Sequence, residues 1–234
     1  MTIRLYGTRL SPYVEKVARA IELKGQPFEV VSPRSPLELK RLNPQTSKMP
    51  VVDFDAERFY DSTFILRELE TRYPQPPLLD SGSNCAAAQR LLEDWCDESL
   101  YWHVMALRAC ERNAAATVQQ VAGVLAPWAR PVAKAVIPRQ LAAMTRAQGF
   151  GRLPYEILVE EMGLRLDDLV HLLAERDFFY SDRPSIADLA VYAQLHTARS
   201  GPTPECESLI SHRPALLAHC ERVEEVCFKA SAAR

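Results

Sequence analysis

Two serines stand where the sequence predicts that a helix begins, and a ligand could meet either hydroxyl group there. Ser11 precedes Pro12 in LYGTRLSPYVEKVARAIELKG, and Ser62 precedes an apolar helical pattern in YDSTFILRELE. A helix N-terminus offers free N–H groups and the positive end of a dipole, which together bind anions. Each serine could equally act only as an N-cap, which satisfies the same N–H groups from within the chain. Taken singly, capping explains both residues, so the choice depends on what lies beside them.

Two neighbouring features add the groups that an amino-acid ligand needs. Pro50 opens the strand pattern in KMPVVDF, and it either lies at a sheet edge or follows a cis bond from Met49. A cis bond would turn the N–H and C=O of Met49 outward, where an extended peptide could pair with them. Asp61, directly before Ser62, could bind an ammonium group. A carboxylate at the helix start and an ammonium at Asp61 would together describe the end of an amino acid.

The first 80 residues must position these groups, and they alternate short apolar runs with helical patterns. The runs predict strands, and the stretches with apolar residues at helical spacing predict helices. The order β-α-β-α-β-β-α implies a small mixed sheet with helices packed on it. The predicted strands cover residues 3–7, 28–31, 50–54 and 58–60, the last two as a hairpin, and the predicted helices cover residues 11–24, 36–42 and 62–73.

A linker is predicted after this region. Residues 73–84, YPQPPLLDSGSN, contain three prolines, a glycine and polar residues. Everything beyond them has helical patterns. We therefore expect an α/β domain at residues 1–78 and an all-helical domain at residues 86–230.

Within the helical part, residues 86–112 predict one long amphipathic helix. Prolines at positions 127, 131 and 138 predict kinks or breaks in the next helical region, residues 114–148. Two further helices are predicted at residues 155–174 and 185–197. Pro214 suits the first turn of the last helix.

Composition argues against several classes of function. The 28 basic and 30 acidic residues give a net charge of −2, which does not favour a nucleic-acid partner. The five histidines and six cysteines show neither metal-ligand spacing nor a disulfide framework, so we expect idle thiols and no metal. No apolar run approaches the ~18 residues of a membrane span. MTIRLYG runs directly into a strand pattern without a signal segment, which predicts a cytoplasmic protein.

Several motifs, in this order and spacing, resemble one family. SPYVEKVARAIELKG, NPQTSKMPVV and YDSTFILRELE are similar to the thioredoxin-like domain of the cytosolic glutathione S-transferases. RPSIADLAVYAQL resembles the capping-box helix of that family, with Ser185 as N-cap and Asp188 three residues later. The resemblance covers nearly the whole chain and implies a thioredoxin-like domain followed by an all-helical one. Ser11-Pro12-Tyr13 is most similar to the serine-type classes, above all the plant tau class and bacterial β-etherase-like members.

The resemblance gives Ser11 a catalytic role. The matching position is a cysteine in the omega class, and a cysteine can form a mixed disulfide with glutathione. A serine hydroxyl cannot, so Ser11 is expected to donate a hydrogen bond to the glutathione sulfur and to favour its thiolate form. The thiolate would then attack an electrophilic carbon. Some classes use a tyrosine at the end of the first strand, but with Ser11 present we expect Tyr6 to serve packing.

Further contacts to glutathione follow from the resemblance, position by position. The Met49 backbone would bind the cysteinyl part, while Asp61 and Ser62 would bind the γ-glutamyl end. Family members often have Glu where this chain has Asp61. Lys48 would lie near the glycyl carboxylate. The complete set of implied glutathione contacts is Arg41, Lys48, Met49, Pro50, Asp61 and Ser62.

The pocket for a second substrate is expected between the two domains. Its candidate residues are Tyr13, Tyr101, Trp102, Met105 and Arg108. The last four recur along the predicted long helix at i, i+1, i+4 and i+7, a spacing that fits a buried core equally well. The acidic residues of LEDWCDESL are expected to form a solvated face; they are Glu93, Asp94, Asp97 and Glu98.

The resemblance implies a cytoplasmic, homodimeric glutathione S-transferase that conjugates glutathione, its co-substrate, to a small hydrophobic electrophile, as in detoxification. Two alternatives remain open. One is a non-catalytic scaffold that binds glutathione or a protein. The other is an enzyme that uses glutathione for reductive ether cleavage or dehalogenation. Fold alone does not separate the three, because the pocket decides the chemistry.

Overall fold

The computed structural model describes residues 3–232. Its sheet has the strand order β2-β1-β3-β4 and comprises β1 (Ile3–Tyr6), β2 (Phe28–Val31), β3 (Val51–Phe54) and β4 (Glu57–Tyr60). β1 pairs in parallel with β2 and antiparallel with β3, and β3 and β4 form the predicted hairpin. The predicted mixed sheet and its element order are confirmed.

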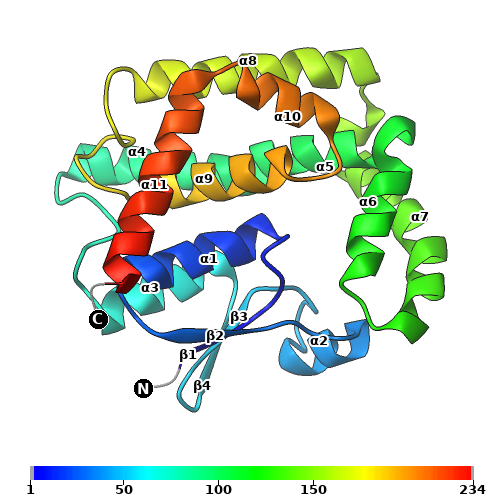
Figure 1. The fold of residues 1–234 in the computed structure, drawn as a ribbon, viewed down its shortest axis with the longest axis horizontal. Helices are drawn as coiled ribbons and strands as arrows, with labels where there is room; N and C mark the ends of the chain where they lie inside the picture. The colour runs from blue at the N-terminus through cyan, green and yellow to red at the C-terminus, as the bar shows by residue number, and fades with distance from the viewer. Residues whose placement is uncertain (1–2, 233–234) are drawn as a thin grey trace.

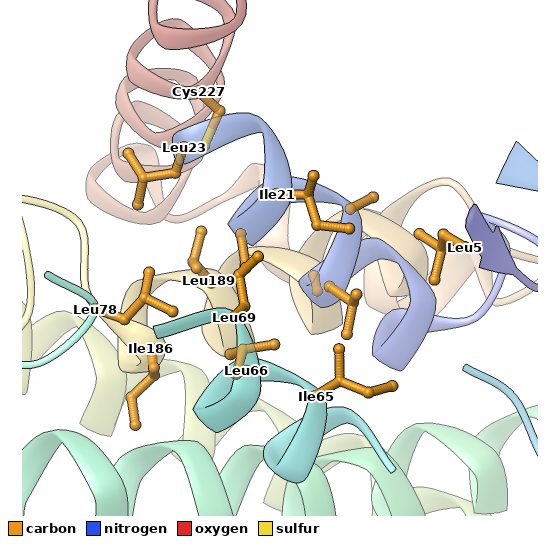
Figure 2. Close-up of a cluster of buried hydrophobic side chains, with 14 of the residues drawn as sticks. Leu5, Ile21, Leu23, Ile65, Leu66, Leu69, Leu78, Ile186, Leu189 and Cys227 are labelled. Carbon is orange, nitrogen blue, oxygen red and sulfur yellow. The ribbon is translucent and has the colours of Figure 1, made fainter. Parts of the chain in front are cut away.

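Three helices accompany this sheet: α1 (Pro12–Leu23), α2 (Pro36–Leu42) and α3 (Ser62–Arg72). α1 is enclosed on nearly all sides, because it lies between the sheet and the helical half of the chain (Figure 1). Ile21 on α1 and Leu69 on α3 join a buried cluster that also contains Ile186 and Leu189 from the helical half (Figure 2). The two halves therefore share this hydrophobic core, which holds α1 against both, and a second buried cluster lies within the helical half.

The predicted linker takes part in this shared core. Leu78 is only 1% exposed, and its carbonyl accepts a hydrogen bond from the Ile186 amide at 2.9 Å. Its own amide donates to the Glu70 carboxylate, which also pairs with Lys24. Sequence composition indicated a simple connection, but the segment is anchored to both halves.

Beyond residue 82 the described chain is helical, and α9 and α11 cover α1 while α8 and α10 lie farther from the sheet (Figure 1). None of the helices within residues 3–232 is long and apolar enough to cross a membrane. The elements are α4 (Ser83–Trp95), η1 (Cys96–Leu100), α5 (Tyr101–Ala109), α6 (Glu111–Gly123), η2 (Pro127–Ala129), α7 (Arg130–Gln148), η3 (Phe150–Arg152), α8 (Tyr155–Leu173), α9 (Ile186–Arg199), α10 (Pro204–Ser211) and α11 (Pro214–Ala232).

The prediction of one long helix over residues 86–112 is wrong in two respects. Its middle, η1, is a π-helical turn, which widens the helix locally. Its end comes early, because Cys110 adopts an extended conformation with φ −58° and ψ 147°, and a new helix begins at Glu111. Of the prolines in the next region, Pro127 opens η2 and Pro131 lies in the first turn of α7. Pro138 lies inside α7, which continues through it.

The two ends of the helical half agree better with the sequence. α8 and α9 lie within two residues of their predicted bounds, and α11 begins at Pro214. At the start of α9, the Asp188 carboxylate accepts hydrogen bonds from the Ser185 amide at 2.8 Å and from its hydroxyl at 2.7 Å. The predicted capping box is confirmed. Asp188 also pairs with the buried His219, which the sequence did not indicate.

Candidate functional site

The sheet brings the three candidate segments together at one end of its strands. Tyr6, the last residue of β1, lies opposite Val51, the first residue of β3, and Val51 also lies opposite Tyr60, the last residue of β4. The segment that leads to Ser11 follows β1, the segment with Pro50 precedes β3, and the start of α3 follows β4. Residues far apart in sequence therefore meet where these three strand ends coincide.

Ser11 directly precedes α1, and its hydroxyl group is free to bind a ligand. The backbone amide donates to the Thr8 carbonyl at 2.9 Å, and the backbone carbonyl accepts from the Glu15 amide at 2.9 Å. The side chain makes no capping hydrogen bond, and within residues 3–232 no other partner of its hydroxyl is found. Pro12 at the first helical position has no N–H to satisfy, which lessens the need for a side-chain cap. Ser11 as a whole is half-buried.

The loop before Ser11 is held by charge pairs. Arg9 forms ion pairs with Glu15 at 2.5 Å and with Glu22 at 3.0 Å, and both carboxylates also bind Arg19. The pKa of Glu15 is lowered, because its bonds to Arg9 outweigh the effect of burial. Glu15 is therefore a structural anion that fixes the loop, and Ser11 is held in place from both sides.

The bond between Met49 and Pro50 is cis, one of the two alternatives that the sequence left open. Pro50 is buried, while Met49 is half-buried against the edge of the shared core. The Asn43 side chain donates to the Lys48 carbonyl at 3.1 Å and to the Thr46 hydroxyl at 2.8 Å, which shapes the turn before the bond.

The start of α3 differs from the sequence interpretation in one respect. Asp61, not Ser62, is the N-cap: its Oδ1 accepts hydrogen bonds from the amides of Thr63 at 3.0 Å and Phe64 at 3.5 Å. Asp61 has φ 69° and ψ 130°, a positive-φ conformation that is uncommon for any residue except glycine. Ser62 is the first helical residue and is buried, while Asp61 is exposed. The carboxylate therefore remains accessible to an ammonium group.

Arg41 and Lys48 are both exposed, and neither forms an ion pair within the described residues. Tyr6, the alternative to Ser11, donates its phenol hydrogen to the Asp53 carboxylate at 3.0 Å and stacks against Arg58. That phenol is engaged within the sheet, in keeping with a packing role.

The predicted solvated acidic face is wrong for two of its four members. Asp94 and Glu98 are exposed, but Glu93 and Asp97 are buried because both bind the ammonium group of Lys16, at 2.7 Å and 2.5 Å. Lys16 lies on α1 and is only 1% exposed, so the contact joins the two halves of the chain. Sequence reasoning missed this cluster, because the complete enclosure of α1 is visible only in three dimensions.

One ammonium group serves two carboxylates in this buried cluster, so its charges do not balance. Burial raises the pKa of Asp97 to about 6, against the attraction of Lys16. The Thr63 hydroxyl, next to the start of α3, donates to Glu93 at 2.8 Å. The cluster therefore connects α1, α3 and the junction of α4 and η1 directly behind the candidate site.

One candidate pocket residue, Tyr13, lies two residues after Ser11 and contacts another, Tyr101. Tyr13 donates its phenol hydrogen to the Asp97 carbonyl at 2.6 Å, and its ring lies 4.8 Å from that of Tyr101. Trp102 packs edge-on against Tyr101, and Met105 is half-buried. Arg108 is buried and donates to the Thr197 carbonyl at 2.8 Å.

Two hollows in the described surface lie elsewhere. One of about 360 Å³ lies between α6 and α7, and one of about 710 Å³ lies where α7 meets α8. Neither includes a residue of the sheet half, so the geometry of the strand ends remains the basis of the candidate site.

Three of the protein's thiols are poorly suited to act as the nucleophile. All six cysteines are free. Burial raises the pKa of Cys206 to about 11 and that of Cys220 and Cys227 to about 12, which keeps these groups protonated. No group of three or more metal-ligating side chains occurs in the part of the chain that the structure describes.

Comparison with known proteins adds a family context. Residues 5–77 match the family model described as the N-terminal domain of glutathione S-transferase, and residues 164–223 match the model of its C-terminal domain. "Failed axon connections" of Drosophila melanogaster is 26% identical over 238 residues, covering 94% of this chain and 54% of the relative. "Glutathione S-transferase U3" of Arabidopsis thaliana is 28% identical over 103 residues, covering 42% of this chain and 45% of the relative. The chain spans about half the length of these curated relatives.

Solved structures match over nearly the full chain. A glutathione S-transferase from Methylobacterium radiotolerans, in complex with glutathione sulfonate, is 28% identical with a TM-score of 0.65, covering 99% of this chain and 94% of that one. The β-etherase LigF from Sphingobium sp. strain SYK-6 is 22% identical with a TM-score of 0.70, covering 97% of this chain and 98% of that one. The latter similarity concerns the fold alone.

Proposed function

Because the chain belongs to the glutathione S-transferase superfamily, we propose that it is a glutathione transferase that activates the glutathione thiol at Ser11. One observation carries the proposal. An unpartnered hydroxyl group at the start of α1 lies at the same end of the sheet as the cis bond at Met49-Pro50 and the exposed carboxylate of Asp61. The relative solved with glutathione sulfonate supports glutathione as the co-substrate.

The proposed binding mode uses each segment for one part of glutathione. The backbone of Met49 pairs with the cysteinyl residue, as a neighbouring strand would. The start of α3, with Ser62, binds the γ-glutamyl carboxylate, while Asp61 binds the ammonium group. Lys48, together with Arg41, supplies positive charge for the glycyl carboxylate.

The chemistry follows from the thiol pKa. A thiol with a pKa near 8.5 is only about 3% ionised at pH 7. A hydrogen bond from Ser11 and the dipole of α1 both favour the anion, and together they could lower the pKa by roughly one to two units. The thiol proton leaves to solvent. The thiolate attacks the electrophilic carbon, the C–S bond forms, and the leaving group departs with its electron pair.

The test is turnover of 1-chloro-2,4-dinitrobenzene with glutathione, comparing the wild type with Ser11→Ala and with Ser11→Thr, which keeps a hydroxyl group. We expect Ser11→Ala to lower kcat about ten-fold or more at pH 7, with little change in glutathione affinity, because only thiolate stabilisation is lost. Ser11→Thr should retain more activity than Ser11→Ala. An unchanged kcat in Ser11→Ala would reduce Ser11 to a cap. Retention on immobilised glutathione without turnover would leave a binding protein.

A homodimer in the cytoplasm, acting in detoxification, belongs to the same proposal. Phe64 on α3 and Leu91 on α4 are large apolar side chains that are 58% and 71% exposed. The hydrogen bond between Thr63 and Glu93 brings the two helices together at this point. Their outer face offers an apolar surface for a second copy of the chain. The cytoplasm keeps the thiol of glutathione reduced.

A further inference from the structure

Arg108 is a buried cation without an anionic partner. It is 9% exposed, and no carboxylate forms an ion pair with it among the described residues. Burial lowers the pKa of Arg108, and the titratable groups that act on its guanidinium against this effect are the thiol of Cys206 and the phenol of Tyr101. A buried charge is costly unless it is paired, which distinguishes Arg108 from Lys16 with its two carboxylates.

The hydrogen bonds of Arg108 are incomplete. Nη2 donates to the Thr197 carbonyl at 2.8 Å, but the enclosed Nε has no partner. Nη1 also lacks a partner within residues 3–232, although it is not fully enclosed. Gly201 makes room for this arrangement, because a Cβ there would lie 2.7 Å from Nη2. Nη1 is therefore the N–H donor of Arg108 that remains for a charge-assisted hydrogen bond to a carboxylate.

Tyr101 lies on the same face of the helix, seven residues before Arg108. Its phenol oxygen has no hydrogen-bond partner in the described chain, and the pKa of Tyr101 is raised by burial, which keeps the phenol a donor. The Tyr101 ring also contacts that of Tyr13, two residues after Ser11. A phenol without a hydrogen-bond partner and a guanidinium without an anionic partner thus follow each other along α5, away from the candidate thiol site.

From these groups we propose that Arg108 and Tyr101 bind a carboxylate group on the second substrate. The inference rests on the proposed function, whose hydrophobic electrophile it narrows to an organic acid. Two helical turns separate the two residues, about 10 Å along the axis. The carboxylate therefore lies at the end of the substrate remote from Ser11. An apolar body the size of a benzene ring lies between the carboxylate and Ser11, against Met105.

The kinetic test compares 4-chloro-3-nitrobenzoate with its methyl ester, which has the same leaving group but no charge. In both, the glutathione thiolate displaces chloride from the ring. We expect Arg108→Met to lower kcat/KM for the acid at least ten-fold and to change that for the ester less than three-fold. Tyr101→Phe should lower the ratio of kcat/KM for the acid to kcat/KM for the ester by a smaller factor than Arg108→Met does.

The matched control is Arg112→Met, because Arg112 is exposed just beyond α5 and stacks on Tyr155. It should leave the acid-to-ester ratio unchanged. A ratio that Arg108→Met also leaves unchanged would overturn the inference while the proposed transferase stands.

A binding measurement separates the inference from the transferase itself. Calorimetry with the unreactive 3-nitrobenzoate, in the presence of glutathione, should show at least ten-fold weaker binding to Arg108→Met than to the wild type. Uncharged 3-nitrobenzamide should bind both equally. Circular dichroism checks that the variant is folded. If binding depends on Arg108 but neither 4-chloro-3-nitrobenzoate nor its methyl ester is turned over, the carboxylate site is supported and the transferase is contradicted. Binding of 3-nitrobenzoate that does not depend on Arg108 would overturn the carboxylate site.

Discussion

Asp61 caps α3 through Oδ1 and also carries the negative charge that we propose for the γ-glutamyl ammonium. A single substitution can separate these two roles. Asparagine is as good an N-cap as aspartate and has nearly the same size, but it has no charge.

For Asp61→Asn we therefore expect glutathione to bind about ten-fold more weakly, a loss of about 1.4 kcal/mol, while thermal stability changes little. Calorimetric titration and a melting curve measure the two quantities. Asp61→Ala is the companion variant and should lose about 1 kcal/mol of stability as well, because the cap is removed. Unchanged glutathione affinity in Asp61→Asn would mean that the carboxylate serves only the helix.

At the scale of elements, η1 places Asp97 where it can serve α1 in two ways. Its carboxylate binds Lys16, and its carbonyl accepts the hydrogen bond of Tyr13. Both residues follow Ser11 within the first two turns of α1, so the π-helical turn supports the position of the proposed catalytic hydroxyl from behind.

The raised pKa of Asp97 predicts a pH dependence of stability. The unfolded carboxyl group ionises near pH 4 and the folded one at about 6, so the folded state holds a proton that the unfolded state has released. The contribution of this bound proton to the free energy of unfolding is present at low pH and is lost as the pH rises through 6. Asp97→Asn lacks it. Between pH 5 and pH 7.5 we expect the unfolding free energy of Asp97→Asn to gain about 1 kcal/mol relative to the wild type.

Urea unfolding of both proteins at the two pH values measures this difference. Asp94→Asn is the matched control, since Asp94 is exposed on the same segment and should show no such gain. A constant difference between Asp97→Asn and the wild type would contradict the buried titration.

At the scale of the whole molecule, the outer face of α3 and α4 decides the proposed assembly. We expect Phe64→Ser combined with Leu91→Ser to convert a dimer into a monomer, because the substitutions remove its apolar surface. Light scattering after size-exclusion chromatography measures the mass. Phe228→Ser, at a 71% exposed position on α11, is the control and should leave the mass unchanged. A wild type that is monomeric at micromolar concentration would contradict the proposal.

The sequence by itself determined the order of the elements in the sheet half, the mixed sheet and the capping box of α9. The individual strands and the capping box depend on residues close in the chain: the strands on short apolar runs, and Ser185 on a partner three residues away. The sequence also located the start of α3, although the N-cap is one residue earlier than expected, because the sequence does not display the positive φ of Asp61.

Only the tertiary structure decided which charged groups are buried and with whom. Lys16 and Asp97 are 81 positions apart, and each alone has the sequence pattern of a solvated residue. Their burial depends on α1 being enclosed by elements from both halves of the chain. Arg108 has the same origin, since its environment comes from α9 and the turn at Gly201. Local pattern fixes elements, but the desolvation of a charge depends on everything that folds around it.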